Sequence, residues 1–410
     1  MATINISKIK NTYGTETALI ILCCRLYFKT AALNELEIFV EDNDIDWKRF
    51  VYLSGIHRIR PIVYKAVFDV NIPAEIKLLL SNEHAETIRL NWKQGIETER
   101  IILLLNKNNI EAVPYKGTAF SKQFYNDFVS RESNDIDLVI NPEHLPLAIQ
   151  ILKKDGYIPE AEDVYQYLGS RYFNYYKDYN LNKFKGRIRD YHLELHWAIA
   201  ENYFNVNPKV NSFIYTYSGQ TAFFRSSIKT LDPVAHFSAM LIHHAIKDGF
   251  TSLKNIVDIS QAIQQPCIQT QVSLLKKTFT NLEMKKVVSI SNILSQQLMG
   301  VSLTELDDPE IADSTTQHFI DNICSSRLLL TDKKLFVSIK NALLLQDSNI
   351  KKLKFFYKIA KLRFIPATTD FRLIKLPKAL FFVYYLIKPF RSIIKPINFI
   401  EEKRKLIPEN

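Results

Sequence analysis

The sequence is poor in glycine, which accounts for only 10 of its 410 residues. β-Barrels, β-sandwiches and glycine-rich dinucleotide-binding folds need many tight turns, so this scarcity argues against them. It favours helices joined by short loops. With 47% hydrophobic and 23% charged residues, the chain has the composition of a globular protein long enough for two or three packed domains.

Cysteine is also scarce. The four cysteines are Cys23, Cys24, Cys267 and Cys324. They form neither a CxxC pair nor a regular spacing, which argues against a zinc knuckle and a disulfide framework and predicts free thiols. The short apolar run 18–24 is preceded by Glu16 and ended by Arg25, an order that does not fit a secretory signal. We therefore expect a cytoplasmic protein.

Long apolar runs are missing too. The run 380–387 spans eight residues between Lys378 and Lys388, whereas a membrane-spanning helix needs about 20. We therefore expect no transmembrane segment. The run 380–387 should instead form an amphipathic helix that docks on its own domain. A membrane surface and an RNA backbone are the alternatives for this run.

The net charge of +10 is concentrated near the C-terminus. Residues 351–410 contain 15 Lys and Arg against 4 Asp and Glu. This excess predicts either an anionic partner at that end or a solvated helical face.

Residues 16–110 have the pattern of successive helices. In the segment 85–105, Ile88, Trp92, Ile96 and Leu103 recur with helical spacing and predict one face of a helix. His57 precedes Pro61 at an expected helix end, and we expect it to be structural.

The pattern changes near Ile110. A short apolar strand over 110–115 is followed by the turn Lys116-Gly117-Thr118, a helix over 118–128 and a second strand over 135–140. The sixteen residues between Thr118 and Asp135 require an extra helical turn or a loop. Asn141-Pro142 then opens a helix to Lys154, which Gly156 closes.

Alternating aromatic and polar residues from Arg171 onward, a turn over 182–186 and the alternation of 189–199 predict a hairpin. Together with the preceding strands it makes a small mixed sheet. After Asp232-Pro233 the pattern is helical again, through 234–247 and 252–263.

Asp135 and Asp137 are two residues apart in an apolar, β-branched run. Both side chains therefore leave the same face of one strand, while Ile136 and Leu138 point into the core. Neighbouring carboxylates repel each other, and a shared divalent cation relieves that repulsion. Hard oxygen ligands favour Mg²⁺ or Mn²⁺.

Glu194 adds a third carboxylate on the expected hairpin, within His192-Leu193-Glu194-Leu195-His196-Trp197. Such a residue can complete a metal site and accept the proton of an attacking hydroxyl. The turn at Gly117 and Thr118 lets backbone amides and a hydroxyl approach a triphosphate.

These motifs resemble those of the DNA polymerase beta-like nucleotidyltransferase superfamily. The closest resemblance is to the bacterial uncharacterised nucleotidyltransferase family proteins, through Lys116-Gly117, Arg131 with Asp135-Ile136-Asp137-Leu138, and Glu194-Leu195-His196-Trp197. Softer matches extend over most of the chain, at 45–47, 57–61, His236, His243-His244, Lys247, Asp258-Ile259, Leu376-Pro377 and Lys388-Pro389.

The resemblance implies an α+β fold with a polymerase beta-like nucleotidyltransferase core and a small mixed sheet, embedded between helical N-terminal and C-terminal regions. The parts expected are an N-terminal helical region (1–105), the core (106–200), a helical domain (201–345) and a basic helical segment (346–410).

It also implies a metal-dependent nucleotidyltransferase that moves a nucleoside monophosphate from a nucleoside triphosphate to an acceptor hydroxyl. Asp135 and Asp137 would bridge two Mg²⁺ or Mn²⁺ ions, and Glu194 would join the ion that activates the acceptor. Gly117 and Thr118 would hold the β and γ phosphates.

Further nucleotide contacts are assigned to Lys116, Arg131, His244 and Lys247. Either lysine could neutralise phosphate charge. The histidines at 236, 243 and 244 lie on the same expected helix as Lys247, and packing within a helical bundle is the alternative role for them.

Other assignments stay open. His192, Glu194 and His196 alternate along one strand and could bind zinc, although zinc would leave the Asp135 and Asp137 pair unexplained. The acceptor could be RNA such as a tRNA end, a protein or peptide, or a small molecule. A non-catalytic nucleotide- or RNA-binding scaffold with the same fold is the alternative of another class. The sequence does not determine the oligomeric state.

Overall fold

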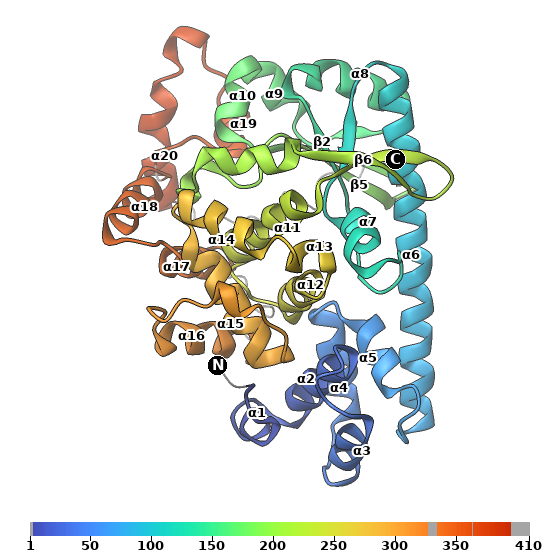
Figure 1. The fold of residues 1–410 in the computed structure, drawn as a ribbon. Coiled ribbons are helices and arrows are strands. Elements are labelled where there is room, and N and C mark those ends of the chain that lie inside the picture. The colour runs from blue at the N-terminus through green and yellow to red at the C-terminus, as the bar shows by residue number, and fades with distance from the viewer. Residues whose placement is uncertain (1–2, 327–333, 363, 395–410) are drawn as a thin grey trace.

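The protein is described here from a computed structural model that covers residues 3–326, 334–362 and 364–394. It is an α+β structure in which one mixed sheet lies among many helices (Figure 1). The first six helices are α1 (Ile6–Tyr13), α2 (Thr15–Tyr27), α3 (Leu33–Glu41), α4 (Trp47–Ile56), α5 (Arg60–Val67) and α6 (Ala74–Lys107). The expected α+β class is confirmed.

The central part of the chain alternates strands and helices. Its elements are β1 (Ala112–Pro114), α7 (Gly117–Phe120), β2 (Ile136–Ile140), α8 (Leu145–Lys154), β3 (Ile158–Pro159), α9 (Glu162–Leu168), α10 (Tyr172–Tyr175), β4 (Asp178–Lys185), β5 (Ile188–His196), β6 (Tyr217–Ala222) and β7 (Ser227–Leu231).

The rest of the described chain is helical. Its helices are α11 (Pro233–Ile242), α12 (Leu253–Ile263), α13 (Pro266–Gln269), α14 (Val272–Asn281), α15 (Lys285–Met299), α16 (Asp313–Cys324), α17 (Lys334–Leu344), α18 (Asn349–Leu362), α19 (Thr368–Leu373) and α20 (Val383–Ile394). Among the described residues, no helix is long and apolar enough to cross a membrane.

The main sheet has the strand order β1-β2-β5-β4-β3. β2 and β5 are parallel, and the other neighbouring strands pair antiparallel. Because side chains alternate along a strand, each strand presents one row of residues to each face of the sheet. Ile136, Leu138, Leu193 and Leu195 form part of the buried apolar cluster on one face. The opposite face carries the polar residues of β2 and β5, as the alternation in the sequence predicts.

A second apolar core lies on the helical side of the molecule. It joins the N-terminal helices to the helices after residue 233, and residues of α2, α12 and α15 meet in it. Asp232 caps α11 by accepting hydrogen bonds from the amides of Val234 and Ala235. The first and third parts expected from the sequence therefore share one core, while the residue boundaries assigned to the four parts stay predictions.

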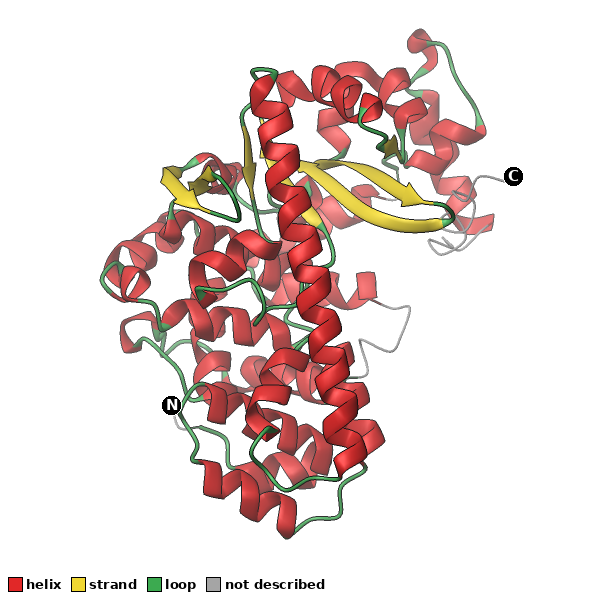
Figure 2. Ribbon diagram, turned by 90° about the vertical axis from the view of Figure 1, so that its right-hand side faces the viewer, coloured by secondary structure: helices red, strands yellow, loops and turns green. Residues whose placement is uncertain are grey.

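The long helix α6 runs along the molecule from the N-terminal helices to the sheet (Figure 2). The helix expected over 85–105 is present, and three of the four residues predicted to share one face, Trp92, Ile96 and Leu103, are exposed. Apolar residues are buried near both ends of α6, whereas the buried side of its middle part is largely polar. Asn91 donates to the carbonyl oxygen of Arg131 at 2.8 Å and accepts from the amide of Ser133 at 3.1 Å. Apolar periodicity cannot reveal a helix face that packs through hydrogen bonds.

Three local predictions require correction. The helix expected over 118–128 stops early, since α7 passes into a π-helical turn (Ser121–Tyr125) that ends at the left-handed residue Asn126. The residues from Asn126 to Asp135 form a loop, which is one of the two arrangements expected for the segment between Thr118 and Asp135. The strand expected over 189–199 ends at His196.

The third correction concerns the start of the hairpin. Residues 172–175 are helical rather than extended, and β4 begins only at Asp178. Tyr172 and Tyr176 stack with ring centroids 4.2 Å apart, a contact between residues one helical turn apart. An aromatic series fits a helix and a strand equally well until its packing is known.

The hairpin of β6 and β7 was not predicted from the sequence. Its turn binds to α6, because the Glu99 carboxylate accepts hydrogen bonds from the amides of Phe224, Arg225 and Ser226. The Phe224 ring lies directly over Gly95, where an added Cβ would come within 2.1 Å of the ring. A glycine in the middle of a helix is here a packing requirement.

We expect Gly95→Ala to destabilise the fold by about 1–3 kcal/mol, because the new methyl group must displace the Phe224 ring. The measurement is urea unfolding followed by circular dichroism. Gly219→Ala in the same hairpin is the control, since an added Cβ there meets nothing within 4 Å. Equal stability of the two variants would contradict the packing assigned to Gly95.

Candidate metal and nucleotide site

The register of the parallel pair brings two predicted carboxylates together. Asp137 on β2 pairs with Glu194 on β5, and Val139 pairs with His196. Paired residues of neighbouring strands share a face of the sheet. His196 Nε2 lies 2.9 Å from Asp137 Oδ1 and 3.1 Å from Glu194 Oε2. Potential ligand atoms of all three residues lie within 4.8 Å of one another.

The charge of Lys116 and hydrogen bonds with histidines favour the ionised form of Asp137 and Glu194. Burial opposes ionisation, but the Lys116 ammonium and the hydrogen bond with His196 lower the pKa of Asp137. Burial also opposes the ionisation of Glu194, yet hydrogen bonds with His192 and His196 hold the pKa of Glu194 well below its usual value. Burial and the charge of Lys116 lower the pKa of His196, which favours the neutral imidazole that a metal ion requires.

Asp135 lies on the same edge of the sheet but outside this three-residue group. Burial, together with the charge of Asp137, raises the pKa of the Asp135 carboxyl. No hydrogen-bond donor in the described part of the chain reaches its side chain. Asp135 is therefore a half-buried carboxylate without an ion-pair partner among the described residues, and the charges of His192 and Arg58 only partly offset the rise in its pKa.

The Lys116-Gly117 turn approaches the acidic group from β1. Lys116 Nζ donates to Asp137 Oδ1 at 2.8 Å and lies 4.0 Å from Glu194 Oε2. Its backbone has φ 62° and ψ −152°, a conformation that residues other than glycine rarely adopt. Gly117 also has positive φ, and a Cβ there would come within 2.9 Å of Ser133 Oγ. The strained turn fixes the lysine against the carboxylates.

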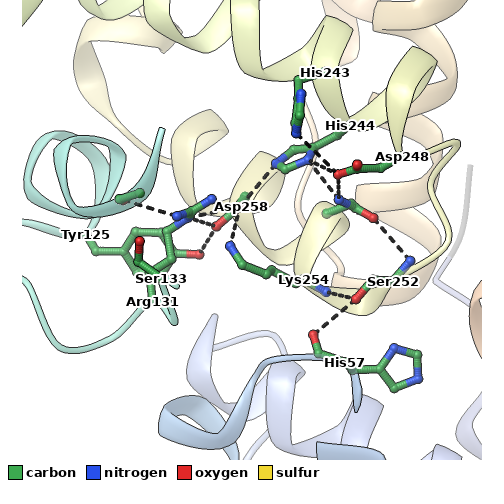
Figure 3. A network of polar contacts seen from close by, with 12 residues as sticks. His57, Tyr125, Arg131, Ser133, His243, His244, Asp248, Ser252, Lys254 and Asp258 are labelled. Carbon is green, nitrogen blue, oxygen red and sulfur yellow. Dashed lines mark hydrogen bonds and ion pairs between the residues drawn. The ribbon is translucent and has the colours of Figure 1, made fainter. Parts of the chain in front are cut away.

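Arg131 connects this turn to Asp258 on the facing helix, and Figure 3 shows Arg131 beside Asp258. Its Nη1 donates to the carbonyl oxygen of Gly117 at 3.1 Å, and its Nε donates to Asp258 on α12 at 2.9 Å. Asp258 is fully buried and also accepts hydrogen bonds from Tyr125 and Lys254. The structure thus places Arg131 in a buried ion pair. Direct contact between Arg131 and the nucleotide stays a prediction.

Two of the predicted helix histidines, His243 and His244, belong to the same network. His244 Nε2 lies 3.1 Å from Asp258 Oδ2, and its Nδ1 lies 2.8 Å from Asn255 Nδ2. His243 Nε2 lies 3.7 Å from Asp248. His236 is buried and contacts Gln123.

His57 caps α12, because its Nδ1 accepts from the amide of Leu253 at 3.1 Å. The structural role expected for His57 is confirmed.

A cleft of about 230 Å³ collects most of the predicted site residues. One wall carries the acidic residues of the sheet, and the other comes from α11, α12 and the turn between them. Its lining includes Lys116, Gly117, Arg131, Asp135, Asp137, Glu194, His244 and Lys247. Thr118 is buried in α7 and is not part of this lining, so the phosphate contact expected from it stays a prediction.

Two residues of the site were not predicted in these positions. The sequence offered His196 as a possible zinc ligand, whereas the parallel register brings it beside Asp137 and Glu194, although it is not part of the cleft lining. Arg58 comes from the turn between α4 and α5 and lines the cleft with positive φ. No described carboxylate lies within ion-pair distance of Arg58. Nothing in the local sequence signals this position, because Arg58 lies far from Asp135, Asp137 and Glu194 in the chain.

The donor set fits a divalent cation. Asp137 and Glu194 supply carboxylate oxygens and His196 supplies one imidazole nitrogen, while Asp135 adds a carboxylate nearby. His192 contacts Glu194 through Nε2 at 3.4 Å, while its Nδ1 lies 2.8 Å from Asn182 Oδ1. The three-residue group whose ligand atoms lie together is Asp137, Glu194 and His196, and His192 is not part of it.

Facing carboxylates on a parallel strand pair inside an α+β fold agree with the resemblance to nucleotidyltransferases seen in the sequence. Comparison with protein families agrees. The chain belongs to the family described as uncharacterised nucleotidyltransferase, whose model matches residues 43–300. No curated protein and no solved structure matches the chain.

We expect Asp258→Asn to destabilise the protein by about 3–5 kcal/mol, because it leaves Arg131 buried without its counter-ion. Glu86→Gln, which removes an exposed ion pair with Arg89, should cost less than about 1 kcal/mol. Urea unfolding at neutral pH measures both. A loss for Asp258→Asn no larger than that for the control would contradict the central role of this pair.

The same pair predicts an acid dependence. Burial opposes ionisation, but Arg131 and Lys254 hold the pKa of Asp258 well below its usual value. The unfolded chain then binds the proton more readily, so stability present at neutral pH is lost as the pH falls below about 4. Urea unfolding between neutral and acidic pH should show this slope, and it should be smaller in Asp258→Asn.

Proposed function

We propose that this protein transfers a nucleoside monophosphate from a nucleoside triphosphate to an acceptor hydroxyl. The observation that carries the proposal is the facing pair Asp137 and Glu194, bridged by His196 within a cleft. Membership of the nucleotidyltransferase family supports it. Asp135, Asp137 and Glu194 are the residues assigned to catalysis.

Asp137, Glu194 and His196 would hold a first divalent cation, with Asp135 completing the acidic edge. The predominance of carboxylate oxygens favours Mg²⁺ or Mn²⁺ over zinc. When bound, such ions neutralise charge on the transferring phosphoryl group and lower the pKa of an acceptor hydroxyl. The assignment of Asp135 and Asp137 as ligands shared by two ions belongs to this proposal.

Phosphate binding is assigned to cations that carry no counter-charge. Lys247 and Arg58 both line the cleft, and neither forms an ion pair with a described carboxylate. Burial and the charges of Lys247 and Lys116 lower the pKa of nearby Lys177 to about 7. This positive surrounding suits a triphosphate. Lys116 is already paired with Asp137, so its role would be to hold that carboxylate in place.

In the proposed reaction, the acceptor oxygen forms a bond to the α-phosphorus. The bond from that phosphorus to the oxygen bridging to the β-phosphorus breaks, and pyrophosphate leaves. The hydroxyl proton passes to a carboxylate of the site. Arg131 contributes by holding the Gly117 carbonyl, which fixes the Lys116 turn beside the carboxylates.

The acceptor would enter from a second cavity of about 530 Å³. This cavity adjoins the cleft and shares Arg58, Glu132, Ser133 and Asn134 with it. Its volume lies in the range of small-molecule sites. An RNA end or a peptide side chain that inserts into it would fit the same arrangement.

Purified protein incubated with Mg²⁺, each α-labelled nucleoside triphosphate and cell lysate should transfer label to RNA, protein or a small molecule. Asp137→Asn and Glu194→Gln should each reduce transfer about 100-fold or more, because cation binding is lost. Manganese binding followed by electron paramagnetic resonance gives a readout besides activity. Asp190→Asn, outside the cleft, is the control.

Transfer by Asp137→Asn at the native rate would contradict the assigned site. Absence of transfer by the native protein, together with retained nucleotide binding, would favour the scaffold alternative.

Lys247→Met and Arg58→Met should each weaken triphosphate binding about tenfold, since each removes a charge-assisted contact to phosphate. Calorimetry with a non-hydrolysable analogue measures the dissociation constant. The control Lys209→Met removes an exposed lysine outside the cleft and should leave the dissociation constant unchanged. Unchanged affinity in both cleft variants would remove these residues from the phosphate site.

A further inference from the structure

Helix α18 carries apolar side chains on its outward face. Ile350, Leu353, Phe356 and Tyr357 are 69%, 71%, 57% and 66% exposed. The spacing of residues 350, 353 and 357 places them on one side of the helix, with Phe356 beside them. Single exposed apolar residues are common on protein surfaces, but four on one helical face are not.

The opposite side of α18 already serves the fold. Phe355 is fully buried, and Ile359 packs against the helical core. The helix is therefore held in place by one apolar side while it presents a second one outward. It lies at the outer edge of the molecule in Figure 1. The outward side is not needed to anchor the helix.

Lysines border the outward face. Lys352 lies on one side of it, and Lys354 and Lys361 lie on the other. Lys354 and Lys358 also line a groove of about 750 Å³ that contains Glu283 and Asp347 as well, and Lys351 in this groove is paired with Glu283. Burial and the charge of Lys354 both lower the pKa of Lys358. An apolar strip between basic borders matches a surface that is apolar inside and anionic outside.

We propose that α18 docks this protein on an anionic membrane surface. The apolar strip Ile350, Leu353, Phe356 and Tyr357 would enter the boundary between headgroups and acyl chains, and the bordering lysines would meet lipid phosphates. An RNA backbone satisfies the lysines but leaves the apolar side chains in water. A second copy of the chain would bring two lysine borders together, which repel each other.

The test is co-sedimentation of the full chain with vesicles of phosphatidylcholine, with and without phosphatidylglycerol. We expect binding to the anionic vesicles that weakens as salt is added. Leu353→Glu should reduce binding to the anionic vesicles about tenfold or more. The variant loses one leucine side chain that would be buried in the membrane and gains a negative charge, and both changes weaken binding. Lys352→Gln/Lys354→Gln should weaken binding to anionic vesicles only.

Leu274→Glu on α14 is the matched control, because that leucine is also exposed on a helix with neighbouring lysines, but no other large apolar residue of α14 is exposed beside it. It should bind as the native protein does. Circular dichroism should show that all variants are folded, since each altered side chain lies at the surface. Nucleotide transfer in solution should also persist.

The proposal is overturned if the native chain does not bind anionic vesicles, or if Leu353→Glu binds them like the control. Filter binding of labelled total RNA and light scattering complete the experiment. Loss of RNA binding in Leu353→Glu without any vesicle binding would assign the face to RNA. Conversion of a dimer to a monomer by the same variant would assign it to a second copy.

Discussion

The buried ion pair between Arg131 and Asp258 connects the two halves of the molecule. Arg131 belongs to the loop before β2, whereas Asp258 belongs to α12 in the helical half. Isolated charges are costly to bury, so each residue requires the other. Through the bond from Arg131 to the Gly117 carbonyl, the pair also fixes the turn that carries Lys116. This contact therefore links the face of the sheet that carries Asp137 to the helical wall opposite it.

The acidic group depends on a second constraint, the parallel alignment of β2 and β5. A parallel register places Asp137 beside Glu194 on one face and leaves Ile136 and Leu193 for the apolar core on the other. A shift of one residue would exchange the two faces. The apolar core thus determines which side chains meet in the cleft, and packing and chemistry are specified by the same alternation.

Positive side chains gather both in the cleft and along α18, and their surroundings differ. In the cleft, Lys116 compensates Asp137, while Arg58 and Lys247 keep their charge available. On α18, lysines border apolar residues that point away from the core. The net positive charge of the chain is therefore not spread evenly, because the residues after 350 supply the excess of Lys and Arg over Asp and Glu. The cations of the cleft lie in the preceding part of the chain, where positive and negative residues nearly balance.

The sequence by itself determined the α+β class, the strands around Asp137 and Glu194, and the capped start of α11 at Asp232. These follow from local rules, since alternation, cap residues and short apolar runs act over a few neighbours. The tertiary structure decided what depends on distant partners. Segments far apart in the chain create the polar contacts of α6 with the loop before β2, the contact of Gly95 with Phe224, and the places of His196 and Arg58. Their residue types gave no local signal, because the same side chains fit a solvated surface until the fold brings their partners to them.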